Sequence, residues 1–264
     1  MPVAESVREG VIDIARQAAS AILAVYAGRF EVECKDDASP VTAADLAAHH
    51  VIVDGLRALT PDIPVLSEES AHEVAASERL GWRRLWVVDP LDGTKEFIKR
   101  NNEFTVNIAL IERGRPVLGV VAAPALGLMY GAAQGVGAFR VNEQGEREAI
   151  RVAGKPAAEA VWRAMVSRSH PSPALADWLE ALGHHELQPL GSSLKFCRIA
   201  EGKADVYPRF GPTSLWDTAA AQAIVEQAGG RVETFDGIPL SYAVRSWANA
   251  EDLLNPHFVA WGST

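Results

Sequence analysis

The uncharged segment 116–139 is the feature that most restricts how this chain can fold. It is long enough to cross a bilayer, but Pro116, Pro124, Gln134 and five glycines interrupt it. Because proline and glycine end regular elements and mark turns, the segment divides into short apolar pieces. We therefore expect buried strands joined by tight turns, and no transmembrane segment.

Strand-like pieces continue on both sides of this segment. They are predicted at 104–111, 117–123, 128–132 and 138–141, each closed by glycine, proline or the turn at 113–115. Strands joined by such short connections pair with their chain neighbours, and the pairs are antiparallel. The sequence therefore predicts an antiparallel meander.

Helices and strands mix in the rest of the chain. Apolar residues at helical spacing predict a helix at 5–27. Helices are also predicted at 42–59, 173–182, 194–201 and 215–227, and glycine stops (Gly202, Gly229-Gly230) end the last two. Short apolar runs predict strands at 30–34, 63–66, 86–88, 161–167, 204–207 and 232–235, and residues 35–40 form a polar loop. This order predicts a layered α+β fold of two subdomains, 1–155 and 156–264.

Charge and cysteine usage limit the class of protein. The chain has 264 residues and a formal net charge of −9, which would repel a nucleic-acid polymer. The two cysteines, Cys34 and Cys197, match neither a zinc motif nor a disulfide framework. Residues 1–10 lack the apolar core of a signal peptide. These observations predict a cytoplasmic protein.

Three acidic clusters occupy positions where binding sites are often built. Glu68-Glu69 follows the strand at 63–66, and a second cluster begins at Asp89 after the strand at 86–88. Asp217 lies in the first turn of the helix at 215–227. Carboxylates at strand ends and helix starts lie at the mouths of sheets.

The second cluster combines the groups that a hard cation prefers. Pro90 favours extended geometry at Asp89, so Asp89 and Asp92 can face one point with the Leu91 carbonyl between them. Magnesium binds oxygen ligands of this kind.

A phosphate site is expected directly after these ligands. Gly93 lets the backbone approach a ligand closely, and Thr94 opens a predicted helical turn at 95–98 whose N–H groups attract phosphate. Metal ligands beside an anion pocket suit the cleavage of a phosphate ester.

Each acidic position also has a purely structural interpretation. The segment 89–94 can be only a turn, and Glu68-Glu69 only a solvated loop. Asp45 and Asp217 each fit the third position of a helix capping box. Only the combination and order of the motifs favour a catalytic site.

In that order the motifs resemble the inositol monophosphatase family of lithium-sensitive, magnesium-dependent phosphatases. The resemblance covers residues 35–230 and consists of four motifs: 39–45, Glu68-Glu69, 89–94 and Trp216-Asp217. It implies an αβαβα sandwich of the sugar-phosphatase type. Segments 92–97, 192–197 and 216–220 are similar to the bacterial 3′(2′),5′-bisphosphate nucleotidase branch of that family.

The resemblance assigns roles to individual residues. It implies two or three Mg²⁺ ions bound by Glu68, Asp89, the Leu91 carbonyl, Asp92 and Asp217. It implies that Glu68 and the hydrogen-bonded pair Asp45–Thr94 act in catalysis. Substrate contacts are expected from Gly93, Thr94, Ser192, Ser193, Lys195, His170, Arg168 and Asp217, with Lys195 as the candidate for a 5′-phosphate.

The implied reaction is the hydrolysis of 3′-phosphoadenosine 5′-phosphate to AMP and phosphate, a step in sulfur metabolism. An inositol monophosphatase or a broad sugar phosphatase would use the same site. A non-catalytic, metal-binding regulatory protein is the alternative of another class. The resemblance leaves open a homodimer and peripheral association with the inner membrane.

Overall fold

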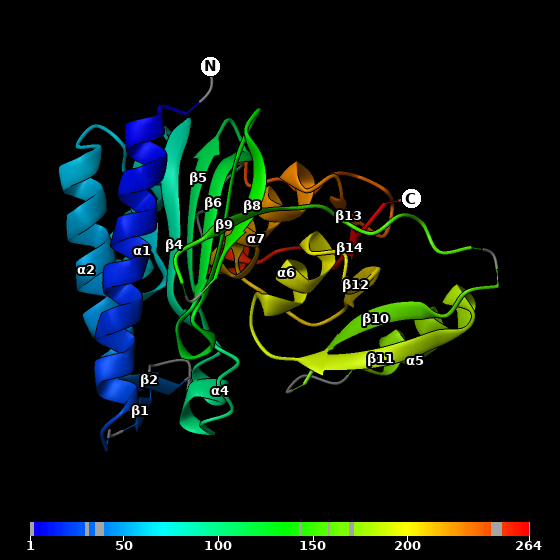
Figure 1. The fold of residues 1–264 in the computed structure, drawn as a ribbon. Helices are drawn as coiled ribbons and strands as arrows, with labels where there is room; N and C mark the ends of the chain where they lie inside the picture. Colours follow the sequence, from blue (N-terminus) through cyan, green and yellow to red (C-terminus); the bar gives the residue numbers. More distant parts are fainter. Residues whose placement is uncertain are drawn as a thin grey trace.

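The computed structural model describes residues 3–29, 32–34, 40–142, 144–157, 159–168, 172–243 and 250–263. Two large β-sheets alternate with three layers of helix (Figure 1). In order, the layers are α1 with α2, a seven-stranded sheet, α6 with α7, a five-stranded sheet, and α5. The predicted α+β class and αβαβα layering are confirmed.

The seven-stranded sheet is the predicted four-stranded meander with two strands added at one end and one strand added at the other. Its order is β3 (Val65–Ser67), β4 (Arg84–Asp92), β5 (Thr105–Glu112), β6 (Arg115–Ala123), β7 (Leu128–Ala133), β8 (Gly137–Val141) and β9 (Arg147–Ile150). Neighbours pair antiparallel except β3 and β4, which are parallel. Strand β9 was not predicted, because three of its four residues are exposed and it lacks an apolar run.

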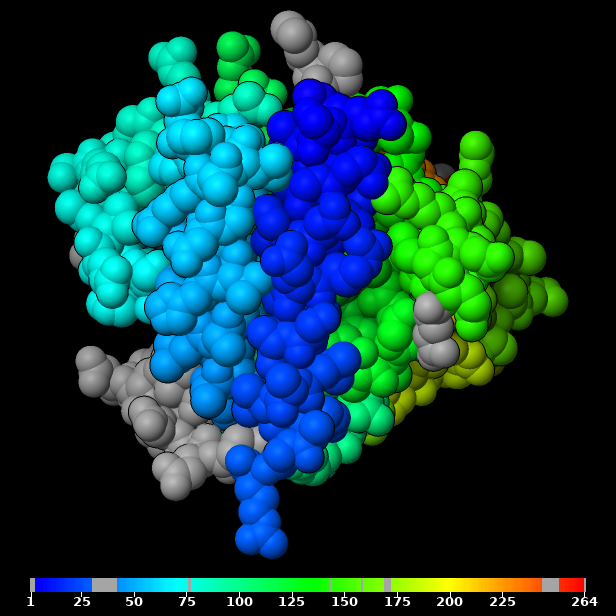
Figure 2. Space-filling model, turned by 60° about the vertical axis from the view of Figure 1, so that its left-hand side comes forward, coloured from blue at the N-terminus to red at the C-terminus, as the bar shows by residue number. Residues whose placement is uncertain are grey.

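Helices α1 (Glu5–Tyr26) and α2 (Ala43–Leu59) cover one face of this sheet. They lie side by side, dark blue and lighter blue in Figure 2. Val11, Ala18 and Ile22 in the apolar stripe of α1 are fully buried, as the helical spacing predicts, whereas Val7 and Tyr26 at its ends are half-buried. The short pair β1 (Val32–Cys34) and β2 (Pro40–Thr42) precedes α2, so a strand begins where the polar loop was expected to end. Residues 30 and 35–39 lie outside the described part of the chain.

Helices α6 (Leu194–Ala200) and α7 (Leu215–Gln227) lie between the two sheets. Helix α7 is buried on most of its circumference, because sheet strands pack on both sides of it. Alanines supply much of that buried surface, and they allow a close approach. A Cβ atom on Gly119 of β6 would lie 2.2 Å from the Ala220 carbonyl oxygen.

The five-stranded sheet has the order β11 (His185–Leu190), β10 (Trp162–Ser167), β12 (Val206–Arg209), β14 (Phe258–Trp261) and β13 (Arg231–Thr234). Helix α5 (Pro173–Leu182) packs on its outer face. Strands β11 and β14 were not predicted. Strand β11 is largely polar and half-exposed, and its place in the sheet depends on parallel pairing with β10.

The predicted strand 86–88 was too short. Strand β4 continues through Pro90 to Asp92, and the β4–β5 register shifts between Asp89 and Asp92. Such an irregularity accommodates a proline and re-aims the flanking side chains. Helical turns follow the strand ends at η1 (Glu68–Glu73) and α4 (Thr94–Ile98), with α3 (Ala76–Arg79), η2 (Pro124–Leu126) and η3 (Ala250–Leu253) elsewhere.

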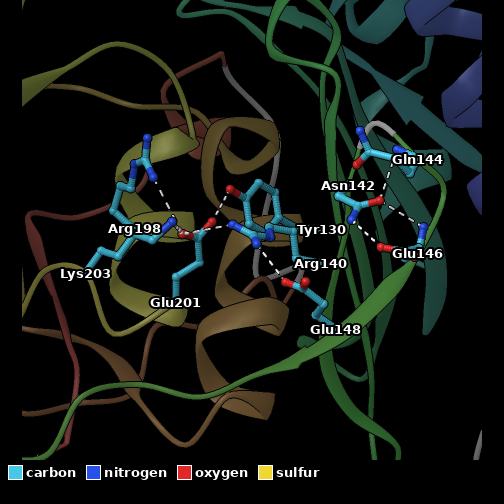
Figure 3. A network of polar contacts seen from close by, with 9 residues as sticks. All are labelled: Tyr130, Arg140, Asn142, Gln144, Glu146, Glu148, Arg198, Glu201 and Lys203. Atoms are coloured by element: carbon cyan, nitrogen blue, oxygen red, sulfur yellow. Dashed lines mark hydrogen bonds and ion pairs between the residues drawn. The ribbon is translucent and has the colours of Figure 1, made fainter.

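A polar network attaches the C-terminal end of α6 to the seven-stranded sheet (Figure 3). The Glu201 side chain is 3% exposed and accepts a hydrogen bond from the Tyr130 hydroxyl. Arg140 of β8, Arg198 and Lys203 also lie within ion-pair distance of this carboxylate. One buried core cluster likewise contains residues from both predicted subdomains, and the boundary at 155/156 stays a prediction. No helix in the described ranges is long and apolar enough to cross a membrane.

We expect Gly119→Ala to destabilise the protein by about 1–3 kcal/mol, because the added methyl group overlaps the α7 backbone. Gly154→Ala is the matched control, since its Cβ would meet no atom within 4 Å. Urea unfolding of both variants measures the difference. Equal midpoints would show that α7 can move away from the sheet without cost.

Candidate active site

A cavity of about 290 Å³ opens between the two sheets. Its lining comes from distant parts of the chain: the end of β4, the start of α4, the N-terminal end of α6, the end of β12 and the first turn of α7. Glu68, Asp89, Leu91, Asp92, Gly93, Thr94, Ser192, Lys195, Arg209 and Asp217 all line it. The fold therefore gathers most of the predicted site residues around one space.

Three carboxylates converge at this cavity. Asp89, Asp92 and Asp217 each place one oxygen within 4.8 Å of the other two. The first two come from the irregular end of β4, and the third comes from α7, more than a hundred residues later. The chemistry of this donor set, carboxylate oxygens alone, fits a hard divalent cation.

Burial and mutual repulsion perturb these carboxylates. Burial is the main cause that raises the pKa of Asp89 well above its usual range, and the charges of Glu68, Asp92 and Asp217 add to it. Burial, followed by Asp92 and Glu68, raises the pKa of Asp217 to about 8. Without a cation, the cluster therefore resists carrying its full negative charge at neutral pH.

Asp45 makes both of the contacts that the sequence suggested for it, the helix cap and the hydrogen bond with Thr94. Its Oδ2 accepts hydrogen bonds from the Thr42 N–H and hydroxyl at 2.7 Å each, which caps α2. Its Oδ1 accepts a hydrogen bond from the Thr94 hydroxyl at 3.3 Å. The two contacts coexist, because each is made by a different oxygen of the carboxylate.

Asp217 also takes part both in a helix cap and in the acidic cluster. Its Oδ2 accepts a hydrogen bond from the Ser214 N–H at 2.8 Å and completes the capping box of α7. The same carboxyl group contributes an oxygen to the acidic cluster. The cap fixes the side chain relative to its helix, so the position of α7 determines where this carboxylate lies.

Two cationic side chains lie in the same cavity. Lys195 is 5% exposed, its Nζ donates to the Ser192 carbonyl at 2.5 Å, and burial lowers its pKa to about 8. Arg209 is 8% exposed and donates to the Pro212 carbonyl at 2.9 Å. Among the described residues the Arg209 Nε has no hydrogen-bond partner. A buried donor without a partner is a candidate for binding an anionic ligand.

Arg209 was missed by the sequence analysis. The strand predicted at 204–207 ends two residues too early, whereas β12 extends to Arg209. Tyr207 and Arg209 are alternate residues of β12 and both line the cavity. Continuing the period-two pattern of the strand would have found the arginine.

The remaining predicted substrate residues differ in their placement. Ser192 lines the cavity, whereas Ser193 is 1% exposed with its hydroxyl bonded to protein groups. Arg168 forms a bidentate pair with Glu103 at 2.7 and 2.8 Å. His170 lies outside the described residues.

Comparison with known proteins gives the family. A family model described as "Inositol monophosphatase family" matches residues 3–260. The chain therefore belongs to the inositol monophosphatase family, and its fold and acidic cavity agree with that assignment.

Proteins named 3′(2′),5′-bisphosphate nucleotidase CysQ are similar over nearly the whole chain. The one from Escherichia coli K12 is 53% identical over 252 residues, 94% of this chain and 96% of that protein. The one from Salmonella typhimurium LT2 is 55% identical over 254 residues, 95% and 97% of the two chains. A crystal structure of CysQ from Bacteroides thetaiotaomicron has a TM-score of 0.82 and 41% identity, covering 97% of each chain.

The raised pKa values predict how the metal-free protein responds to pH. A carboxyl group whose folded pKa lies above its unfolded value near 3.8 binds more protons when folded. Folding stability therefore falls as the pH rises between those two values, by about 1.4 kcal/mol per pH unit for one group. We expect the melting temperature in EDTA to fall between about pH 5 and pH 8.

Thermal unfolding with and without a divalent cation measures this effect. Mg²⁺ should restore the melting temperature most at the upper end of the range, because it compensates the ionised carboxylates. Asp217→Asn should reduce the slope in EDTA. If Asp217→Asn leaves the pH dependence of the melting temperature in EDTA unchanged, that dependence does not come from this cluster.

Proposed function

We propose that this protein is a magnesium-dependent phosphatase that hydrolyses the 3′-phosphate of 3′-phosphoadenosine 5′-phosphate to AMP and phosphate. The observation that carries the proposal is the pairing of two anion-binding devices in one cavity. The carboxylate cluster suits a metal-bound phosphate, and Lys195 with Arg209 offers buried positive charge for a second phosphate. The relatives that are 53% and 55% identical are named 3′(2′),5′-bisphosphate nucleotidase, and those names support a bisphosphate nucleotide as the class of substrate.

Glu68, Asp89, Asp92, Asp217 and the Leu91 carbonyl would hold the Mg²⁺ ions, all of them lining the cavity. When bound, two such ions activate a water molecule and stabilise the leaving oxygen of an in-line displacement. The four carboxylates cannot approach a phosphate alone, because like charges repel. A hard cation matches their oxygen donors and offsets their charge.

The Asp45–Thr94 pair would orient the attacking water. The Thr94 hydroxyl donates to Asp45 Oδ1, so its oxygen lone pairs can accept a hydrogen bond from water at the cavity wall. Threonine is a weak base by itself, and the buried carboxylate of Asp45 would take up the proton through it.

The scissile phosphate would lie against the Gly93 and Thr94 N–H groups at the start of α4. Gly93 has a left-handed backbone (φ 92°), and a Cβ there would lie 3.1 Å from the Glu103 carbonyl oxygen. Glycine therefore lets the chain turn sharply beside the metal ligands. Ser192, beside Lys195 in the lining, is the proposed neighbour of the second phosphate.

The test of this function compares turnover of the bisphosphate nucleotide with turnover of inositol 1-phosphate. We expect kcat/KM with Mg²⁺ to be higher for the nucleotide. Preference for inositol 1-phosphate would identify an inositol monophosphatase with the same site, and inactivity on all phosphate esters would favour the regulatory alternative.

Lys195→Ala should raise KM for the nucleotide by about 10-fold or more, because a charge-assisted contact to its 5′-phosphate is lost. For inositol 1-phosphate, which has no second phosphate, KM should change little. Steady-state kinetics on both substrates make the comparison. Equal effects on both would remove Lys195 from this role.

Thr94→Ala and Asp45→Asn should each lower kcat by about 10²–10⁴-fold with little change in KM, because positioning and deprotonation of water contribute to the transition state. Asp45→Asn retains an oxygen for the α2 cap, so its unfolding midpoint reports any structural loss separately. Full activity in Thr94→Ala would exclude the proposed water-orienting pair.

A further inference from the structure

The carboxylate of Asp92 is held by a set of hydrogen bonds that leave only one of its oxygens available. Its Oδ2 accepts from the Ser193 N–H at 2.6 Å and from the Ser193 hydroxyl at 2.7 Å. Longer contacts to the same oxygen come from the Thr105 hydroxyl at 3.4 Å and the Asn107 amide at 3.3 Å. An oxygen with this many donors has little capacity left for a metal ion, so Oδ1 is the one that can face the cluster.

Ser193 connects this ligand to the other half of the metal site. Its Oγ also lies 2.9 Å from the backbone carbonyl of Asp217. The hydroxyl has one proton for two acceptors, the Asp92 carboxylate and the Asp217 carbonyl, and it shares that proton between β4 and α7. The Ser193 side chain thus contacts both of the elements that supply the cluster.

Asn107 orients the Ser193 hydroxyl. It lies opposite Asp89 in the β4–β5 register, and its Nδ2 donates to Ser193 Oγ at 2.8 Å. The same Nδ2 lies 3.3 Å from Asp92 Oδ2 and 3.5 Å from the Trp216 carbonyl. All three partners accept hydrogen bonds, so the NH₂ end of the amide must face them.

The carbonyl end of the Asn107 side chain lacks a comparable contact among the described residues. Asn107 is 1% exposed, and among the described residues its Oδ1 has no hydrogen-bond partner. A buried acceptor without a donor is unfavourable for folding and rare in native proteins. Asn107 therefore makes its Nδ2 contacts beside the carboxylate cluster at an energetic cost.

We propose that Ser193 and Asn107 are positioning residues, which hold Asp92 as a one-oxygen metal ligand and set the distance between β4 and α7. This inference rests on the proposed metal site. Ser193 therefore acts through Asp92, in contrast to the direct substrate contact expected from the sequence. The Glu201 network at the far end of α6 supports the arrangement, because it fixes that helix on the same sheet (Figure 3).

The test measures metal affinity directly. Mn²⁺ binding to the full chain is followed by the electron paramagnetic resonance signal of free Mn²⁺, for wild type, Ser193→Ala, Asn107→Ala and the double variant. We expect each single variant to raise the Mn²⁺ Kd by about 10-fold or more, as for other residues that orient metal ligands. In the double variant the change in the Mn²⁺ binding free energy should be smaller than the sum of the two single changes, because both residues act on one oxygen.

Thr60→Ala is the matched control. Its hydroxyl accepts from the Trp86 Nε1 at 2.9 Å at the end of α2, so its loss lowers stability without touching the cavity. Its Mn²⁺ Kd should equal that of wild type.

At saturating Mg²⁺, Ser193→Ala should lower kcat while KM for the nucleotide stays within about twofold of wild type.

The outcomes distinguish a failure of the proposed metal site from a failure of the proposed positioning role. Wild-type protein that binds no Mn²⁺ would reject the metal site itself. If the wild type binds Mn²⁺ and Ser193→Ala leaves the Mn²⁺ Kd unchanged but raises KM for the nucleotide, the positioning role is rejected. That result would support a direct contact between Ser193 and the substrate. If Ser193→Ala does not fold, as seen by near-ultraviolet circular dichroism, Asn107→Ala decides by the same Kd criterion.

Discussion

The concentration of buried negative charge at the cavity is the constraint on which the rest of the structure depends. Asp89, Asp92 and Asp217 approach one another closely enough for a single ion to contact all three. In the absence of a cation this arrangement is unfavourable, and the raised pKa values of Asp89 and Asp217 express that cost. A fold can hold such groups together only if other interactions prevent them from separating.

The restraining interactions are hydrogen bonds made by the carboxylates around the cavity. Asp45 uses Oδ2 to cap α2 and Oδ1 to accept from Thr94, and Asp217 uses Oδ2 to complete the cap of α7. Asp92 uses Oδ2 to bind the N-terminal end of α6. Each side chain is thereby fixed in place by a structural hydrogen bond.

Much of the local structure could be predicted from the sequence because it follows from short-range patterns. The end of the helix at α7 was predicted from its glycine stop, and the meander from strands closed by glycine or proline. Among the strands that escaped prediction, β9 and β11 lack an apolar run and acquire their strand conformation by pairing with a neighbouring strand. The same limit explains Arg209, which lies two residues beyond the predicted strand end but inside the strand that pairing with β14 defines. Strand β14 is an apolar run that the sequence analysis missed.

The sequence by itself determined which chemical groups are present and in what order: paired acidic motifs, a glycine turn and helix-capping aspartates. These follow from bonding within a few residues, which the order of the chain specifies directly. Only the tertiary structure decided that Asp217 meets Asp89 and Asp92, that Lys195 and Arg209 share their cavity, and that Ser193 faces Asp92 and not the cavity. Those relations depend on how the two sheets pack around α6 and α7, and packing between distant segments has no local pattern in the sequence.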